Sequence, residues 1–195
     1  YGDDAWDTKH YLNIWVCNLG VRLLGYASTL GGPASKDGVV IQYTAFGTTG
    51  TAVYPFNKGR SSTHEIGHWL GLQHTWGDAD CGDDGIADTP PQKTYNNGCP
   101  SFPHLSGCSI NNSGDMFMNF MEFTDDACMN LFTHGQKQKM RSLFAMGGHR
   151  NTFLNSNVCD SNAEVGGPLP SDTTVSNYSI KLYPNPAVTT IMVEL

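Results

Sequence analysis

Two histidines four residues apart are the first residues whose type and spacing could do chemistry. Residues 64–74 read His-Glu-Ile-Gly-His-Trp-Leu-Gly-Leu-Gln-His. On a helix, His64 and His68 project from the same face one turn apart, so both imidazoles can reach one metal ion. Zinc suits this pair, because it binds imidazole nitrogens at about 2.0–2.1 Å. Glu65 can touch a metal-bound water but is rotated away from the metal, which makes it the candidate general base.

A glycine after the histidine pair predicts the third metal ligand. Gly71 can take a positive φ, which would end the helix and turn the chain away from its axis. That turn would bring His74 to the metal as a third nitrogen ligand. Three protein ligands leave one position open, which is typical of a catalytic zinc. The alternatives are a core helix with hydrogen-bonded histidines, a zinc that only stabilises the fold, and a site retained without activity.

Two helices are predicted, and the first must carry the histidine pair. The hydroxyl residues Ser61–Thr63 are N-cap candidates, which places this helix at about residues 62–70. Its apolar face consists of Ile66, Trp69 and Leu70. The second helix follows Thr133, which forms a capping-box pattern with Gln136. Its apolar stripe consists of Met140, Leu143 and Phe144.

Three stretches rich in β-branched and aromatic residues are predicted to be strands. Residues 11–16 alternate between two faces, and residues 39–46 form another such run. Residues 48–54 contain Gly50 and stop before Pro55, which favours an edge strand that could pair with an extended peptide. Residues 75–130 show no regular pattern, so metal ions and disulfides are the means expected to hold them.

The composition predicts a folded protein in an extracellular compartment. The chain has 195 residues, 39% of them hydrophobic, and a net charge of −7 with only 11 lysines and arginines. This balance argues against nucleic acid and anionic membranes as partners. No apolar run approaches the roughly 20 residues of a membrane-spanning helix, so no membrane insertion is predicted. Six cysteines without a Cys-x-x-Cys pair favour disulfides over a zinc cage, and spacing alone selects no pairing.

The long histidine motif resembles that of the metzincin metallopeptidases, in which a tight turn with a methionine lies beneath the metal. Residues Asn119–Phe123 are similar to that turn. The residues around both motifs resemble the pappalysin family, in particular its bacterial secreted branch. These residues are Gly59–Arg60, His74–Asp78, Asp88–Pro90 and Thr124–Met129, within a likeness that covers about residues 6–159.

The resemblance implies an α+β fold with a metzincin, or zincin-like, catalytic domain. A twisted sheet with an edge strand and the active-site helix would lie above an irregular lower subdomain. Disulfides and calcium would staple this subdomain, which ends in a C-terminal helix. The zinc ligands would be His64, His68 and His74. Glu65 would act first as base and then as acid, and Met121 would form a hydrophobic floor under the site.

The resemblance also implies a disulfide pairing. The expected pairs are Cys81 with Cys108 and Cys99 with Cys128. Each bond closes a short loop and could stabilise the fold by about 3 kcal/mol. Cys17 and Cys159 remain, and elimination pairs them with each other.

An acidic cluster follows the first helix and needs either solvent or a cation. Residues 78–88 contain five aspartates, and no lysine or arginine lies between Arg60 and Lys93. Carboxylates this close repel one another, and calcium is bound by such oxygen ligands. The resemblance implies a structural calcium ion held by Asp84, the Ala87 carbonyl and Thr89. The alternative is a solvated acidic turn.

The chain departs from the family pattern in two ways. Phe123 stands where many metzincins have a tyrosine two residues after the turn methionine, so a hydroxyl that could assist catalysis is missing there. Only 63 residues precede His64. We therefore expect the chain to begin inside the upper subdomain, with a latency pro-segment further upstream and outside this chain.

The composition divides the chain into three parts. Residues 1–159 are interpreted as the catalytic domain with an incomplete N-terminal part, and residues 160–177 as a linker rich in small and polar residues. Residues 178–195 contain Leu-Tyr-Pro-Asn-Pro and resemble the start of a C-terminal sorting domain of type IX secretion cargo. The alternative for this last part is an ordinary hairpin.

These observations predict a secreted zinc endopeptidase that acts on proteins or peptides. The substrate would lie along residues 48–54, and Glu65 would deprotonate the attacking water. Asp125 and Asp126 would favour a basic substrate residue on the primed side of the cut. The competing hypothesis is a binding or adhesion module that keeps the metal-stabilised fold without proteolysis. A different metal hydrolase, such as an amidase, is a further alternative.

Overall fold

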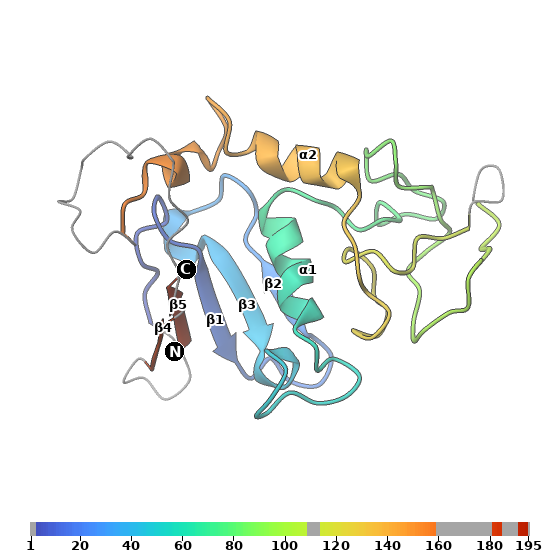
Figure 1. The fold of residues 1–195 in the computed structure, drawn as a ribbon, viewed down its shortest axis with the longest axis horizontal. Helices are drawn as coiled ribbons and strands as arrows, with labels where there is room; N and C mark the ends of the chain where they lie inside the picture. Colours follow the sequence, from blue (N-terminus) through green and yellow to red (C-terminus); the bar gives the residue numbers. More distant parts are fainter. Residues whose placement is uncertain (1–2, 109–113, 159–180, 185–190, 195) are drawn as a thin grey trace, which may run out of the picture.

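The fold is taken from a computed structural model that describes residues 3–108, 114–158, 181–184 and 191–194. A three-stranded sheet lies on one side of helix α1 (Arg60–Trp69), as Figure 1 shows. The strands are β1 (Asn13–Cys17), β2 (Gly25–Ala27) and β3 (Gly38–Gln42), in the spatial order β1-β3-β2. β1 runs parallel to β3, whereas β2 runs antiparallel to it.

The strand predictions are confirmed in part. β1 and β3 overlap the predicted runs 11–16 and 39–46, although β1 continues to Cys17 and β3 begins one residue earlier. β3 begins at Gly38 and ends at Gln42, because a 3-10 turn, η2 (Tyr43–Ala45), follows directly.

The predicted edge strand at residues 48–54 is wrong. This segment folds into turns, with glycines at positive φ at positions 47 and 50 and a local hydrogen bond from the amide of Ala52 to the carbonyl of Thr49. The edge beside α1 is formed instead by β2, whose three residues are too few to show an alternating pattern.

A hydrophobic core lies between the three-stranded sheet and α1. Val39, Ile41 and Trp69 are almost fully buried. Burial of each such side chain stabilises the fold by about 1.5–3 kcal/mol. The partly buried side chains packed against them are Leu12, Ile14, Ala27, Phe46, Ile66, Leu70 and Phe153. This packing fixes α1 against the sheet and therefore fixes the histidines on its other face.

Helix α1 begins earlier than the sequence predicts. Its N-cap is Gly59, at φ 73°, and no side chain caps it locally, so the expected hydroxyl cap is wrong. The carboxylate of Asp126 accepts hydrogen bonds from the amides of Lys58 and Arg60 at 2.7 and 3.2 Å. A side chain distant in sequence thus satisfies the first amide of the helix and one amide just before it.

The end of α1 follows the prediction. Gly71 has φ +79°. Its amide donates to the carbonyl of His68 at 2.8 Å, and the amide of Leu72 donates to the carbonyl of Gly67 at 3.0 Å. These two bonds form a Schellman motif, in which a left-handed glycine reverses the chain.

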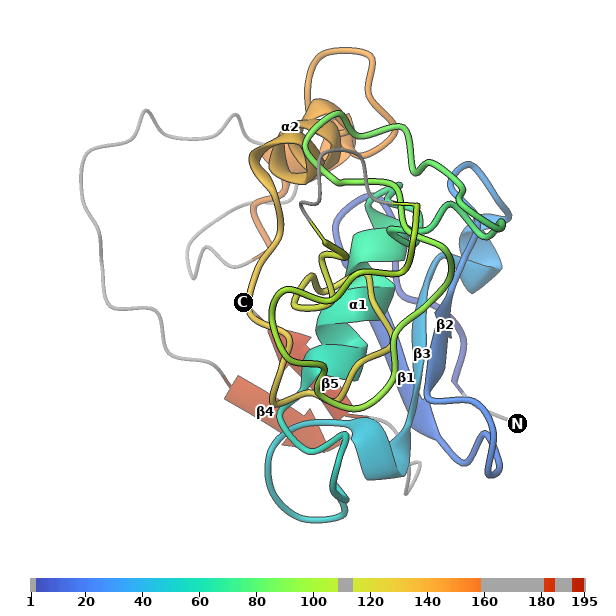
Figure 2. The same ribbon diagram turned by 90° about the vertical axis from the view of Figure 1, so that its right-hand side faces the viewer.

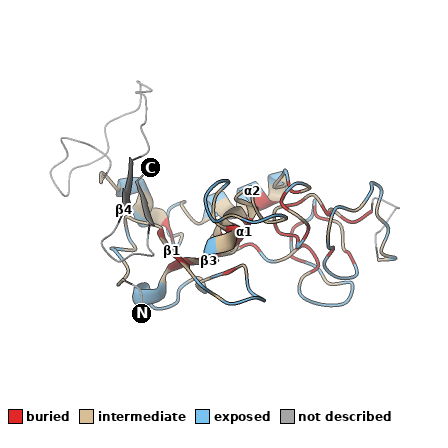
Figure 3. Cartoon of the chain, turned by 90° about the horizontal axis from the view of Figure 1, so that it is seen from below, coloured by how far each residue is buried: buried red, intermediate tan, exposed pale blue. Residues whose placement is uncertain are grey.

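The region after α1 is irregular, and two disulfides join its loops. Cys81 pairs with Cys108 and Cys99 with Cys128, as expected. Figure 2 shows these loops, in green and yellow, in front of α1, with helix α2 (His134–Ser142) above them. Buried residues continue from the sheet into this region (Figure 3). The loops are therefore packed even though they lack regular hydrogen bonding.

Helix α2 begins with the predicted capping box. The Thr133 side chain accepts from the amide of Gln136, and the Gln136 side chain accepts from the amide of Thr133. Gln136 also exchanges two hydrogen bonds with Asn119, at 2.8 and 3.1 Å. This fully buried amide pair connects the start of α2 to the predicted methionine turn.

Beyond α2 a short 3-10 turn, η4 (Asn151–Asn155), is followed by an antiparallel pair, β4 (Lys181–Pro184) and β5 (Ile191–Glu194). An earlier 3-10 turn, η1 (Ala34–Lys36), precedes β3. The predicted linker 160–177 and Cys159 lie outside the described residues, so the domain division and the Cys17–Cys159 pairing stay predictions. In the described part of the chain, none of the helices has the length and apolar character needed to cross a membrane.

Candidate metal centre

The side chains of His64, His68 and His74 meet at one point. The Nε2 atom of His68 lies 3.0 Å from Nε2 of His64 and 3.0 Å from Nε2 of His74. One ligand atom from each histidine falls within 4.8 Å of the others. A tetrahedral zinc ion at about 2.05 Å from each nitrogen would hold its ligand atoms about 3.3 Å apart. The three nitrogens therefore fit one zinc ion.

Hydrogen bonds on the other ring nitrogens fix the orientation of all three imidazoles. Nδ1 of His64 lies 2.7 Å from the carbonyl of Phe120, and Nδ1 of His68 lies 2.9 Å from the carbonyl of Leu72. Nδ1 of His74 lies 2.6 Å from a carboxylate oxygen of Asp78. Because these oxygens only accept, each Nδ1 carries the proton and each Nε2 presents its lone pair to the common point.

The imidazoles on α1 are held in the neutral form that a metal requires. Burial, supported by the neighbouring His68 and His74, lowers the pKa of His64 to about 3. Burial also lowers the pKa of His68. Both rings are therefore unprotonated on Nε2 at neutral pH.

The predicted methionine turn supports the site from below. Met121 is fully buried, and a side chain on Gly67 would overlap its sulfur atom. Glycine at this position of α1 lets the turn approach closely enough for Phe120 to bond His64. Met121 therefore packs closely against the helix that carries the first two predicted ligands.

Glu65 lies in the same cavity as the histidines. It is only 7% exposed, and burial raises the pKa of its carboxyl to about 7. The first residue of β2 contacts it closely, because a Cβ on Gly25 would lie 2.7 Å from Cγ of Glu65. A carboxylate with a pKa near neutrality is suited to accept and return a proton.

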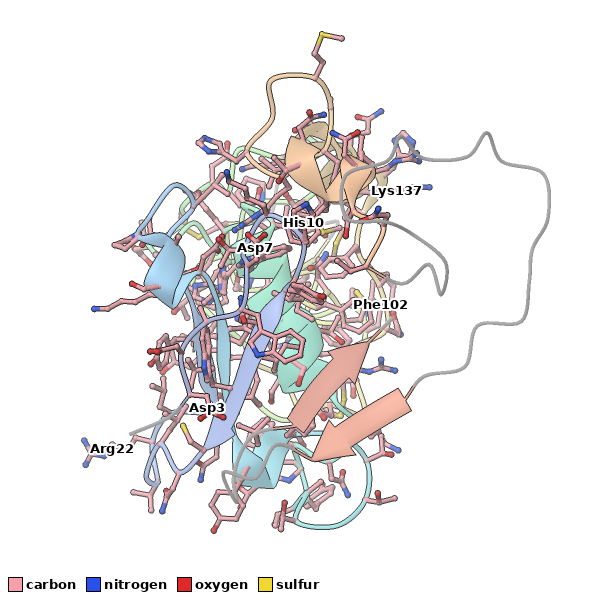
Figure 4. The ribbon with its side chains drawn as sticks, turned by 90° about the vertical axis from the view of Figure 1, so that its left-hand side faces the viewer. Asp3, Asp7, His10, Arg22, Phe102 and Lys137 are labelled. Carbon is pink, nitrogen blue, oxygen red and sulfur yellow. A yellow bond between two sulfur atoms is a disulfide. The ribbon has the colours of Figure 1, made fainter. Side chains whose placement is uncertain are left out.

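A cavity of about 720 Å³ opens over the metal centre. Residues 22–30, which include β2, form one wall, and the three histidines and Glu65 form another. Phe56, Leu72 and Met129 contribute apolar surface. Arg22 stands at the rim, where its side chain extends away from the ribbon (Figure 4). This size and lining suit a segment of an extended ligand.

The two aspartates predicted to set specificity occupy different environments. Asp126 lines the cavity but is buried, and one of its oxygens is bonded to the amides of Lys58 and Arg60. Asp125 is half-buried, and its amide donates to the carbonyl of Gly98 at 2.9 Å. Their influence on substrate choice stays a prediction.

Aromatic rings surround the third histidine. The indole of Trp76 stacks on His74, with ring centroids 4.3 Å apart and an angle of 4° between the planes. Phe123 lies edge-on to both rings at 4.8 Å, and Tyr95 lies 5.5 Å from Phe123. Phe123, at the position of the expected tyrosine, therefore packs against a predicted metal ligand. Trp76 is buried, and the sequence does not reveal its contact with His74.

Two of the three residues predicted to bind calcium lie together. Asp84 is 2% exposed, and one of its oxygens accepts from the hydroxyl of Thr89 at 2.6 Å and the amide of Ile86 at 3.0 Å. Its second oxygen is buried without a hydrogen-bond partner among the described residues. Burial raises the pKa of Asp84 despite these bonds. An orphaned buried carboxylate oxygen of this kind fits a cation site.

Comparisons with known proteins agree with this geometry. The family model Peptidase_M43, described as Pregnancy-associated plasma protein-A, matches residues 2–145. An extracellular metalloprotease of Pyricularia oryzae is 38% identical over 133 residues, which are 63% of this chain and 44% of that protein. An extracellular metalloprotease of Verticillium alfalfae is 44% identical over 94 residues, 48% of this chain and 33% of its own.

A solved structure also matches. Mature mirolysin of Tannerella forsythia, in complex with a cleaved peptide, is 54% identical with a TM-score of 0.75, and the match covers 78% of this chain and 59% of that one. The chain thus spans less than half the length of these two fungal metalloproteases and about three fifths of mirolysin. The expected metzincin-like metalloprotease fold is confirmed. The chain belongs to the pappalysin family of peptidases, the family of Pregnancy-associated plasma protein-A.

Proposed function

We propose that this chain is the catalytic part of a secreted zinc endopeptidase that hydrolyses peptide bonds in proteins or peptides. The observation that carries the proposal is the convergence of three Nε2 atoms beside Glu65 in one open cavity. Zinc bound there would polarise the scissile carbonyl and lower the pKa of a bound water toward about 7.

Glu65 performs the proton transfers in this proposal. Its buried carboxylate accepts a proton from the attacking water and later delivers that proton to the leaving amine. The histidines and Glu65 line one cavity, so this carboxylate would lie beside a water bound to the metal. The backbone of Gly25 limits where this side chain can lie.

The substrate lies along the free edge of β2 in this proposal, and the segment at residues 48–54 has no part in it. β2 is hydrogen-bonded to β3 on one side, and its residues form a wall of the cavity. An extended peptide can pair with such an edge through main-chain hydrogen bonds. A preference for basic residues would rest on the carboxylates of Asp125 and Asp126, just beyond the methionine turn.

The structural calcium ion remains part of the proposal. The paired oxygens of Asp84 and Thr89, together with the orphaned oxygen of Asp84, support it. The Ala87 carbonyl is the third proposed ligand. Calcium would remove the free-energy cost of the buried carboxylate, since a buried charge must be paired or neutralised.

An extracellular location is supported by two disulfides and by the names of the relatives. We include in the proposal the bacterial secreted branch of the family, the type IX route through the tail at residues 178–195, and an upstream pro-segment. The solved mirolysin structures include a form named promirolysin.

Cleavage of casein, measured with and without a chelator, tests the proposed function. The expected result is cleavage that chelation abolishes and added zinc restores. Metal binding without any cleavage would favour the binding or adhesion module. Cleavage that persists after all zinc is removed would contradict the metal mechanism.

A further inference from the structure

We propose that Asp78 is a positioning residue that holds the third metal ligand, His74, and thereby sets the affinity of the site for zinc. This inference rests on the proposed zinc site. It assigns a role to a residue that the sequence marks only as a member of an acidic cluster and as the end of the family-like stretch His74–Asp78.

His74 needs support that the other two ligands already have. His64 and His68 belong to α1, and a backbone carbonyl accepts from each ring. His74 lies beyond the helix end, in an irregular segment that follows the turn at Gly71. Ordering a flexible side chain at the moment of binding would cost free energy, so a ring held in place beforehand gives a tighter site.

The carboxylate of Asp78 provides that support. Its Oδ1 lies 2.6 Å from Nδ1 of His74, which is shorter than the distances from His64 and His68 to their carbonyl partners. Hydrogen bonds to an ionised acceptor are shorter and stronger than those to a neutral one. Such a carboxylate fixes the tautomer and increases the basicity of the metal-binding nitrogen.

Trp76 adds the second constraint on the same ring. Its indole is 5% exposed and stacks on His74, while Asp78 bonds the ring edge. Stacking fixes the plane of the imidazole, and the hydrogen bond fixes its rotation within that plane. Together, the two contacts orient the ring so that its Nε2 atom points toward the other two histidines.

The backbone around Asp78 is wound into a conformation that few residues accept. Asp78 has φ 55°, and Gly77 before it has φ 58°. A side chain on Gly77 would lie 2.5–2.7 Å from backbone atoms of Asp83. Aspartate, asparagine and glycine tolerate this left-handed region better than other residues. Cys81, in the same loop, is tied to Cys108, so the loop is anchored where it presents Asp78.

The hydrogen bond between Asp78 and His74 should affect zinc affinity more than the stability of the fold. The side chain of Asp78 is 62% exposed, whereas that of His74 is 17% exposed. Solvent screening keeps an exposed pair of this kind weak as a stabilising contact. Removing the carboxylate should therefore weaken zinc binding and leave the metal-free fold nearly unchanged.

The test compares Asp78→Gly, Asp78→Asn and Asp80→Asn in the full chain. Glycine and asparagine both tolerate the positive φ at position 78. Asp80 serves as the control because it is an exposed aspartate of the same loop. Zinc dissociation constants are measured by competition with a chromogenic chelator, and circular dichroism checks the metal-free fold. The absorption spectrum of the cobalt-substituted protein reports on the ligand geometry.

We expect Asp78→Gly to weaken zinc binding by about 10- to 100-fold and to shift the cobalt spectrum. Asp78→Asn keeps a neutral acceptor and should restore part of the affinity. Asp80→Asn should bind zinc within about twofold of the parent, in keeping with a screened surface charge.

Two results would overturn the inference. One is an Asp78→Gly protein that binds zinc as tightly as the parent, and the other is an equal loss in Asp80→Asn, which would reveal a general charge effect. A parent protein that binds one zinc ion but cleaves nothing would contradict the proposed function instead. The comparison of affinities would still decide the role of Asp78 in that case.

Discussion

At the scale of single residues, the site depends on close approaches that only glycine permits. Gly67 lets Met121 pack against α1, and Gly25 brings β2 against Glu65. The histidine motif predicts the ligands from their spacing alone. It does not reveal Gly25 or Asp78, because their roles arise from contacts that the fold creates.

Replacing Gly25 with alanine should impair the proposed catalysis. The new Cβ would lie 2.7 Å from Cγ of Glu65 and 2.9 Å from the carbonyl oxygen of Val40, so the carboxylate must move. A displaced catalytic group can lower the rate by about 10- to 100-fold. Peptide cleavage and zinc affinity of Gly25→Ala should be measured together. Unchanged cleavage would show that Glu65 has room to move, and a large loss of zinc would point to damage beyond Glu65.

At the scale of elements, sequence signals that act locally predict the structure correctly. The glycine that ends α1 and the capping box that starts α2 both involve residues at most five apart. The predicted start of α1 is wrong because Asp126, 66 residues beyond Arg60, accepts a hydrogen bond from the first amide of the helix. The edge strand is predicted in the wrong segment. The three residues of β2 form the edge because they pair with β3, and their composition alone does not indicate a strand.

The buried carboxylate of Glu122 connects several of these irregular elements. It is 1% exposed and accepts hydrogen bonds from Thr75, Gln92, the amide and side chain of Asn96, and the amide of Phe123. These donors come from the segment after His74, from the disulfide-bonded loops and from the methionine turn. The methionine-turn resemblance includes Glu122 but does not predict that its carboxylate accepts these hydrogen bonds.

Glu122→Gln should destabilise the fold although it nearly preserves shape. An amide nitrogen would face donors and leave at least one of them without an acceptor, which costs about 1–3 kcal/mol. Urea denaturation of the metal-free protein measures this difference in the free energy of unfolding. Equal midpoints for Glu122→Gln and the parent would show that the network around Glu122 contributes little.

At the scale of the whole molecule, one cluster of side chains connects the segment after α2 to the sheet and α1. Arg150 is 4% exposed, lies 3.7 Å over the ring of Trp69, and forms an ion pair with Asp37. Trp69 and Ser28 also donate to the Asp37 carboxylate, at 2.8 and 3.1 Å. The cluster therefore joins the end of α1, the loop before β3 and the chain beyond residue 145.

Breaking this cluster should destabilise the protein in a pH-dependent manner. Burial alone would raise the pKa of Asp37, but the hydrogen bonds from Arg150 and Trp69 outweigh it and lower the pKa below the ordinary value of 3.8. The stabilisation is therefore present at neutral pH and is lost as the pH falls below about 3.8. Arg150→Met should cost about 1–3 kcal/mol at pH 7, because a half-buried carboxylate loses its ion-pair partner and keeps only the hydrogen bonds from Trp69 and Ser28.

Urea unfolding of Arg150→Met and of the parent at pH 7 and at pH 3 checks both parts of this prediction. The difference between the two proteins should be smaller at pH 3, because the lowered pKa of Asp37 makes the stabilisation depend on its ionised form, and the unfolded chain takes up the proton below about 3.8. A difference that stays constant with pH would show that Arg150 acts by packing on Trp69 rather than through Asp37.

The most direct test of the whole account is the cleavage rate of Glu65→Gln with its bound zinc measured in the same sample. Glutamine fills the same space but cannot take a proton from water, so we expect one zinc ion per chain and a rate about 100- to 10,000-fold below that of the parent. A Glu65→Gln protein that cleaves casein at the parent's rate would contradict the assignment of Glu65 as the group that transfers the proton.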